Sequence, residues 1–187
     1  MRKVIAAELV SVDGVMESPG EWAFSYSNDE MEEANASGMA TSDALLLGRV
    51  TYEGLAAFWP NQPGGDPMVD YINSVPKFVV SATMEGPPEW QNSTLIKGNV
   101  AEEIAKLKRL PGKDIAITGS GTLVHSLWQD DLLDELGLMV HPVVVGSGKR
   151  LFEDGGDQKG LKLVDSKTFR TDVIYLTYQP AGKEAEG

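Results

Sequence analysis

The chain has 187 residues, 42% of them hydrophobic, which predicts one globular domain with a full core. Sixteen basic against 28 acidic residues give a formal net charge of −12, which opposes broad contact with nucleic acid or anionic lipid, so any phosphate site has to be local. The absence of cysteine excludes disulfides, thiolate metal sites and cysteine nucleophiles, and two histidines are too few for a multi-histidine metal site, so we expect no bound metal.

The first predicted strand covers residues 3–10 and is apolar almost throughout, as expected for a strand that is covered on both faces. It carries no secretory signal pattern, and no stretch of the chain reaches membrane-spanning length, so we expect a cytoplasmic protein with neither a membrane nor a nucleic-acid partner. A turn over 11–15 leads into a loop that carries Trp22 and Phe24. That loop is either an active-site flap or a plug at the edge of the core.

A helix is predicted over 28–40, followed by a second strand over 43–48 that runs directly into another helix. Arg49 and Thr51 therefore lie in the first turn of that second helix. A cation is disfavoured at a helix N-terminus, so Arg49 makes sense there if it binds an anion such as the phosphate of a dinucleotide. The alternative is an ion pair between Arg49 and one of the many surface acids.

Helices and strands continue to alternate, with a helix over 67–75 and strands over 77–81, 93–97 and 114–118. Hydroxyl groups follow one of these strands, at Ser81 and Thr83. Asn99 and Glu102 have the spacing of a capping box at the start of the next helix. Because ligands of open α/β sheets bind at the carboxyl ends of strands, these positions point to one edge of the sheet.

The segment 114–128 combines a short apolar strand, a turn of small residues and an amphipathic helix. Gly119, Ser120 and Gly121 form the turn, so that backbone N–H groups at the helix start can approach an anion such as a pyrophosphate. The alternative is a tight turn that only connects strand and helix. The pattern is not a Rossmann fingerprint, because Val124 stands where the third glycine is needed.

The C-terminal part changes character. A long apolar strand is predicted over 132–145, and alternating strands over 161–166 and 172–179 follow without a helix between them, which indicates antiparallel pairing. We expect a single domain over 1–180 and a polar tail over 181–187. The predicted fold is three-layer α/β/α, with a mostly parallel central sheet and antiparallel C-terminal strands.

Several of these segments, taken in this order, resemble the dihydrofolate-reductase-like superfamily. The closer resemblance is to stand-alone relatives of the C-terminal reductase domain of the bifunctional riboflavin-biosynthesis deaminase-reductases, the RibD C-terminal family. It covers about residues 2–179. The matching segments are 11–14, 47–53, 77–83, 119–123, 134–136, 141–148 and 151–152.

The resemblance implies an NADPH-dependent reductase that transfers a hydride to a small substrate. By this resemblance, the adenosine ribose-phosphate would contact Gly48, Arg49, Thr51, Ser81 and Thr83. The pyrophosphate would contact Gly119, Ser120, Gly121, Thr122 and Leu123. The nicotinamide would be bordered by Ala7, Val12 and Gly14. The substrate would lie near Asp13, Trp22, Tyr52 and Trp59.

Asp13 is the candidate for orienting the substrate or relaying a proton, and the alternative is a turn-forming residue before Gly14. The bifunctional relatives also carry a zinc deaminase domain with cysteine ligands, for which this chain has neither the length nor a cysteine. The predicted substrate side is rich in acids and aromatic residues. We therefore expect a small uncharged or cationic heteroaromatic or carbonyl substrate, in place of the phosphorylated riboflavin intermediate.

Two other kinds of protein fit the same pattern: a dinucleotide-binding module without catalysis, and an interaction protein that uses the fold as a scaffold. The turn at 119–121 and the placement of Arg49 argue against the scaffold. The resemblance also implies a homodimer. The apolar strand 136–145 would then form part of the interface or, alternatively, the centre of the core.

Overall fold

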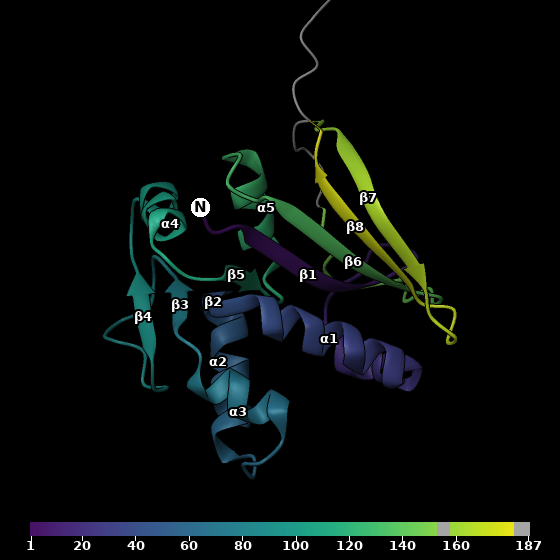
Figure 1. Cartoon of the computed structure of the whole chain (residues 1–187), viewed down its shortest axis with the longest axis horizontal. Helices are drawn as coiled ribbons and strands as arrows, with labels where there is room; N and C mark the ends of the chain where they lie inside the picture. Colours follow the sequence, from purple (N-terminus) through teal and green to yellow (C-terminus); the bar gives the residue numbers. More distant parts are fainter. Residues whose placement is uncertain (153–157, 182–187) are drawn as a thin grey trace, which may run out of the picture.

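The central element is one mixed sheet, seen in the computed structural model, which describes residues 1–152 and 158–181 (Figure 1). Its strands are β1 (Val4–Ser11), β2 (Ser42–Gly48), β3 (Lys77–Val80), β4 (Ser93–Ile96), β5 (Asp114–Ile117), β6 (Glu135–His141), β7 (Leu161–Thr168) and β8 (Ile174–Pro180). They lie in the order β4-β3-β2-β5-β1-β6-β8-β7. The strands from β4 to β6 pair in parallel, whereas β8 pairs antiparallel with both β6 and β7.

Helices cover both faces of this sheet. They are α1 (Asp29–Thr41), α2 (Arg49–Phe58), α3 (Pro67–Ser74), α4 (Val100–Arg109) and α5 (Gly121–Gln129), with short 3-10 helices at Pro19–Glu21, Phe24–Tyr26 and Trp59–Asn61. In Figure 1, α1 to α3 lie on one side of the sheet and α4 and α5 on the other. The predicted α/β fold, with a mostly parallel sheet and antiparallel C-terminal strands, is confirmed. None of these helices is long and apolar enough to cross a membrane.

The inner strands are apolar on both faces because each face meets a helix layer. In β2, Ala44 and Leu46 belong to the core cluster that includes Val124 of α5. The alternate residues, Leu45 and Leu47, pack in a separate cluster on the α2 side. All four side chains are buried, so the near-continuous apolar run reflects a parallel strand between two layers.

The strand predicted over 132–145 is shorter in the structure. It begins at Glu135, because the backbone N–H groups of Leu132 and Leu133 both donate to the carbonyl of Leu127 and close the end of α5. It ends at His141, because Pro142 has no N–H group for a ladder. The strand lies between β1 and β8, so the part of 136–145 that is a strand is internal to the sheet.

Strand β5 is shorter than its neighbours β1 and β2, and its early end leaves room for a site. Its pairing with β1 stops at Ala6 opposite Ile117, while β1 remains paired with β6 as far as Ser11 opposite His141. On its other side, the pairing of β5 with β2 also stops at Ile117. The carboxyl halves of β1 and β2 therefore have no strand between them. The turn that follows β5 lies at this place, in the position where open sheets bind ligands.

Candidate functional site

A cavity of about 690 Å³ opens at the carboxyl edge of the sheet. Its walls come from β1, the loop after β1, the start of α2, the turn before α5 and the segment before residue 151. The predicted site residues that line it are Ala7, Gly48, Arg49, Thr51, Gly119, Ser120, Gly121, Thr122 and Leu123. The structure thus brings the predicted pyrophosphate turn together with part of the predicted adenosine side.

The turn before α5 has the backbone of an anion cradle. Gly119 and Ser120 both have positive φ, at 67° and 63°, and α5 begins at Gly121. The N–H groups of Leu123 and Val124 donate to the carbonyl of Ser120, which closes the first helical turn. The N–H groups of the first helical residues have no intrahelical acceptor, so they are available to a ligand.

One of the N–H groups expected to meet an anion is already used. The N–H of Gly119 donates to Oε2 of Glu8 at 3.0 Å. The cradle is therefore formed by the start of α5, while Gly119 is held from the side of β1. The backbone N–H of Gly119 is therefore not free for the predicted contact with the pyrophosphate.

The turns that follow β2 and β5 touch each other. A Cβ atom at Gly48 would overlap Oγ of Ser120, and one at Gly119 would lie 3.0 Å from Cγ2 of Thr51. Gly48 has a φ of −75°, which any residue can adopt. Glycine is needed at this position because Ser120 approaches so closely, and not because of the backbone conformation. The small residues noted in the sequence are thus needed where two β-to-α turns meet.

Arg49 forms the ion pair that was the alternative to an anion contact. Its Nη1 lies 3.1 Å from Oε1 of Glu53, one helical turn away, and both side chains are partly exposed. An exposed pair of this spacing contributes only about 0.3–0.5 kcal/mol, so an incoming phosphate can replace it. Arg49 also lines the cavity with Lys149 and Arg150. The lining includes two carboxyl groups, Glu8 and Glu17, so the basic side chains outnumber the acidic ones and the cavity is locally basic in an acidic protein.

Glu8 is a cavity residue that was not predicted from the sequence. Its side chain is buried in the middle of β1, at 3% exposure, and Oε1 has no hydrogen-bond partner among residues 1–152 and 158–181. Burial raises its pKa well above the usual value for glutamate, and the hydrogen bond from Gly119 opposes this only in part. The signal was present in the sequence as a single carboxylate within an otherwise apolar strand.

The carboxylate of Asp13 holds the loop after β1 to the segment after β6. It accepts hydrogen bonds from Oγ of Ser11 at 2.6 Å and from the N–H groups of Val145 and Gly146 at 3.1 and 2.8 Å. The bond from Ser11, followed by those from Gly146 and Val145, lowers the pKa of Asp13 to about 2. Asp13 does not line the cavity, and a group this acidic carries no proton near neutral pH. The geometry favours the turn-forming alternative over a proton relay.

Val12, Gly14 and Trp22, which were also predicted to border the nicotinamide or the substrate, lie in or directly after this loop. Trp22 is buried, with its indole N–H donating to the carbonyl of Glu17 and its ring against the edge of His141, 5.5 Å between centroids. Trp22, Val12 and Gly14 do not line the cavity. Of the two alternatives for this loop, the position of Trp22 matches the plug at the core edge.

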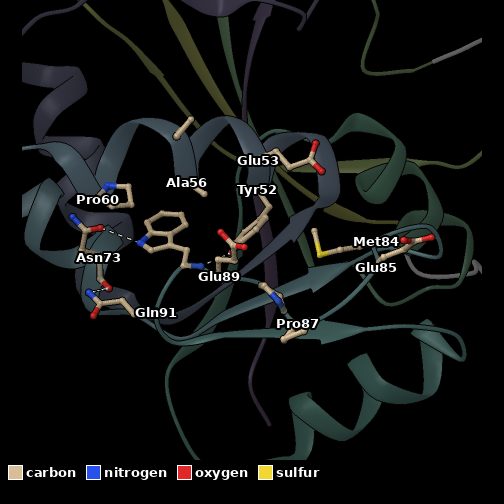
Figure 2. Close-up of a pocket in the computed structure, with 13 residues that line it drawn as sticks. Tyr52, Glu53, Ala56, Pro60, Asn73, Met84, Glu85, Pro87, Glu89 and Gln91 are labelled. Carbon is tan, nitrogen blue, oxygen red and sulfur yellow. Dashed lines mark hydrogen bonds between the residues drawn. The ribbon is translucent and has the colours of Figure 1, made fainter.

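Tyr52 faces a different cavity, of about 790 Å³, between α2 and the segment before β4 (Figure 2). Its hydroxyl accepts a hydrogen bond from the N–H of Trp90 at 2.9 Å. Glu53, Glu85 and Glu89 line this cavity, and none of its described lining residues is a lysine or arginine. Its charge therefore disfavours an anionic ligand such as a dinucleotide.

Trp59, Ser81 and Thr83 are also absent from the lining of the basic cavity. Trp59 packs with the apolar cluster under α2. Oγ of Ser81 accepts hydrogen bonds from the N–H groups of Thr83 and Met84, which forms a local turn after β3. The predicted contacts of these three residues with cofactor or substrate stay predictions without support from the cavity geometry.

A mixed sheet of this topology between two layers of helices is the dihydrofolate-reductase-like α/β fold. The family model described as the RibD C-terminal domain matches residues 2–175, and the chain belongs to this family. The chain is 31% identical over 182 residues to the uncharacterized protein YyaP of Bacillus subtilis (strain 168), a match that covers 95% of this chain and 94% of that protein.

Solved structures show the same fold. A putative riboflavin biosynthesis protein from Shewanella sp. PV-4 superposes with a TM-score of 0.77 at 24% identity, covering 97% of this chain and 99% of that one. A pyrimidine reductase-like protein from Corynebacterium diphtheriae has a TM-score of 0.69 at 12% identity, covering 96% and 92% of the two chains. At these identities the likeness establishes the fold, and the substrate has to be inferred from the site.

Proposed function

We propose that the protein is an NADPH-dependent reductase that transfers a hydride to a small heteroaromatic or carbonyl compound. It would be related in chemistry to 5-amino-6-(5-phosphoribosylamino)uracil reductase and dihydrofolate reductase. The observation that carries the proposal is the meeting of two β-to-α turns at a basic cavity, where Gly48 and Ser120 come into contact and α5 begins. Membership of the RibD C-terminal family supports a reductase.

The residues of the cavity fit a dinucleotide. The N–H groups of Gly121 and Thr122 and the dipole of α5 suit a diphosphate, and the close turns leave the backbone accessible. Arg49 suits a phosphate on the side of α2, and Lys149 and Arg150 add positive charge on the other side. The bound cofactor would supply the hydride.

The rest of the lining is mainly apolar and would enclose a flat ring. Leu9, Met16, Leu55, Val80 and Val100 contribute to the walls. These side chains would exclude water and hold substrate and nicotinamide in contact, which is what hydride transfer requires of the protein. We propose that the basic side chains serve the cofactor phosphates, leaving a small uncharged or cationic compound as the substrate.

Titration with NADPH and, separately, NADH, followed by quenching of tryptophan fluorescence, tests the proposal. We expect NADPH to bind in the micromolar range, NADH to bind more weakly, and Arg49→Ala to weaken NADPH binding by about 1.5–3 kcal/mol because a charge-assisted bond to phosphate is lost. Lys106→Ala is the matched control, since Lys106 is an exposed lysine paired with Glu102 and Glu103 on α4.

Absence of binding for both dinucleotides would contradict the proposal, and so would Arg49→Ala with unchanged affinity. A screen of carbonyl, pterin and pyrimidine compounds for NADPH oxidation then separates the reductase from the alternative. NADPH that binds but is never oxidised would identify a non-catalytic dinucleotide-binding protein. Efficient turnover of the phosphorylated riboflavin intermediate would contradict the proposed substrate class.

A further inference from the structure

Glu8 lines the basic cavity just beyond the point where β5 ends. At this level β1 is still paired with Leu138 of β6, but its other neighbour, β5, has already ended at Ile117. The side chain of Glu8 reaches across this gap to the N–H of Gly119, at 3.0 Å. It therefore ties β1 directly to the turn that opens α5.

The second carboxyl oxygen of Glu8 is buried and has no hydrogen-bond partner within the part of the chain that the structure describes. Nearly all buried polar atoms in proteins are hydrogen-bonded, so an exception at a cavity calls for an explanation. The alternate residues of β1 that share its face, Ala6 and Val10, belong to the apolar core cluster. Nothing about the strand itself requires a carboxyl group among them.

Burial favours the neutral form of this carboxyl group. Its pKa is raised first of all by burial, and only the hydrogen bond from Gly119 acts in the opposite direction. The charged side chains that line the cavity with Glu8 are Glu17, Arg49, Lys149 and Arg150. The elements around it also carry the titratable side chains of Tyr52 and Glu53 on α2, His125 on α5, and Glu135 and His141 on β6. None of these contributes to the shift, so burial is the main cause of the raised pKa of Glu8.

A negative charge on Glu8 would lie directly behind the turn that the proposed diphosphate contacts. Like charges repel strongly where water is excluded, so this charge would oppose binding of the diphosphate. We propose that Glu8 positions the turn at Gly119 as a neutral carboxyl group, and that binding of a dinucleotide requires Glu8 to keep or take up one proton. This inference rests on the proposed dinucleotide function and adds the residue that makes binding depend on pH.

The test compares the dissociation constants of NADPH for the wild type and Glu8→Gln from about pH 6 to about pH 9. Gln keeps an acceptor for the N–H of Gly119 and is neutral at every pH, and the ratio of the two constants cancels the titration of the ligand itself. We expect the ratio of wild type to variant to rise with pH, by up to about tenfold per pH unit above the pKa of Glu8. Glu32→Gln, an exposed residue of α1, controls for net charge.

Thermal unfolding without ligand gives a second readout. The folded protein holds the proton of Glu8 to higher pH than the unfolded chain does, so unfolding releases a proton and wild-type stability falls as pH rises from the unfolded towards the folded pKa. Gln has no proton to lose. We expect the melting temperature of Glu8→Gln relative to the wild type to rise by about 2–4 °C between about pH 5 and about pH 8.

Calorimetry of the wild type in two buffers of different ionisation enthalpy needs no variant, and should show proton uptake on NADPH binding at the alkaline end. Glu8→Leu, which removes the acceptor for Gly119, should bind NADPH at least tenfold more weakly at every pH, by about 1.4 kcal/mol or more. A ratio that stays constant with pH, or no proton uptake, would overturn the inference and leave the proposed function intact. No binding by any variant or by the wild type would overturn both.

Discussion

Gly48→Ala is expected to lower the affinity for NADPH by at least about tenfold and to destabilise the fold by about 1–3 kcal/mol. The added methyl group would overlap Oγ of Ser120 and lie 3.0 Å from its Cβ, so the turn before α5 has to move. Because that turn carries the proposed diphosphate contacts, a methyl group added at the end of β2 should displace the backbone N–H groups that bind the ligand at the start of α5. Fluorescence titration and thermal unfolding measure the two effects.

Gly54→Ala is the matched control. Gly54 lies on α2, and a Cβ atom there would meet nothing within 4 Å. Alanine is favoured over glycine inside a helix by roughly 0.5–1 kcal/mol, so this variant should be as stable as the wild type or slightly more, with unchanged affinity. Ser120→Gly should rescue Gly48→Ala, because it removes the overlapping side chain and suits the positive φ at that position. Normal binding by Gly48→Ala alone would contradict the proposed role of the paired turns.

The substitution with the largest expected cost in stability is Lys77→Ala. The side chain of Lys77 is fully buried at the start of β3. Its Nζ donates to the carbonyls of Val75, Asn73 and Gln91, at 2.9, 3.3 and 3.4 Å, and lies 4.2 Å from the ring centroid of Trp90. Alanine would leave a cavity and deprive these carbonyls of their donor, for a loss of about 3–5 kcal/mol measured by urea unfolding.

Lys77→Met separates the cavity from the charge, since it keeps an unbranched apolar side chain and should cost less, about 1–3 kcal/mol. Burial lowers the pKa of Lys77 to about 8. Between that value and the higher pKa of the unfolded chain, the unfolded state binds more protons, so wild-type stability rises with pH. Relative to Lys77→Met, the wild type should gain about 2–3 kcal/mol between about pH 7.5 and about pH 10. A difference that does not change with pH would contradict the burial of a charged amine.

The fold could be predicted from the sequence because its signals are local and periodic. The alternation of Leu45 and Leu47 with Ala44 and Leu46 marks a strand between two layers, and the absence of a helix between 161–166 and 172–179 marks antiparallel pairing. Two local features were not predictable. Asn99 adopts a left-handed conformation with no side-chain cap, so the expected capping box does not form. The strand after α5 is shortened by bonds to Leu127 that no periodicity reveals.

The cavity brings together the predicted residues whose role rests on backbone chemistry, and it leaves out those whose position depends on how loops fold back. The glycine turn and Arg49 line one cavity because strand ends of a parallel sheet meet at one edge. The aromatic residues Trp22, Tyr52 and Trp59 instead pack locally, each against neighbours that only the tertiary structure supplies. Glu8 was overlooked even though its spacing from Ala6 and Val10 places it on the buried face.

A crystal structure of the protein with NADP⁺ bound tests the central claim most directly. We expect the diphosphate within hydrogen-bond distance of the N–H groups of Gly121 and Thr122, and a phosphate within reach of Arg49 in place of Glu53. The nicotinamide should enter the gap between the carboxyl halves of β1 and β2, beside Ala7. A dinucleotide in the acidic cavity of Tyr52 and Trp90, or no bound dinucleotide at saturating concentration, would contradict the assignment of this site.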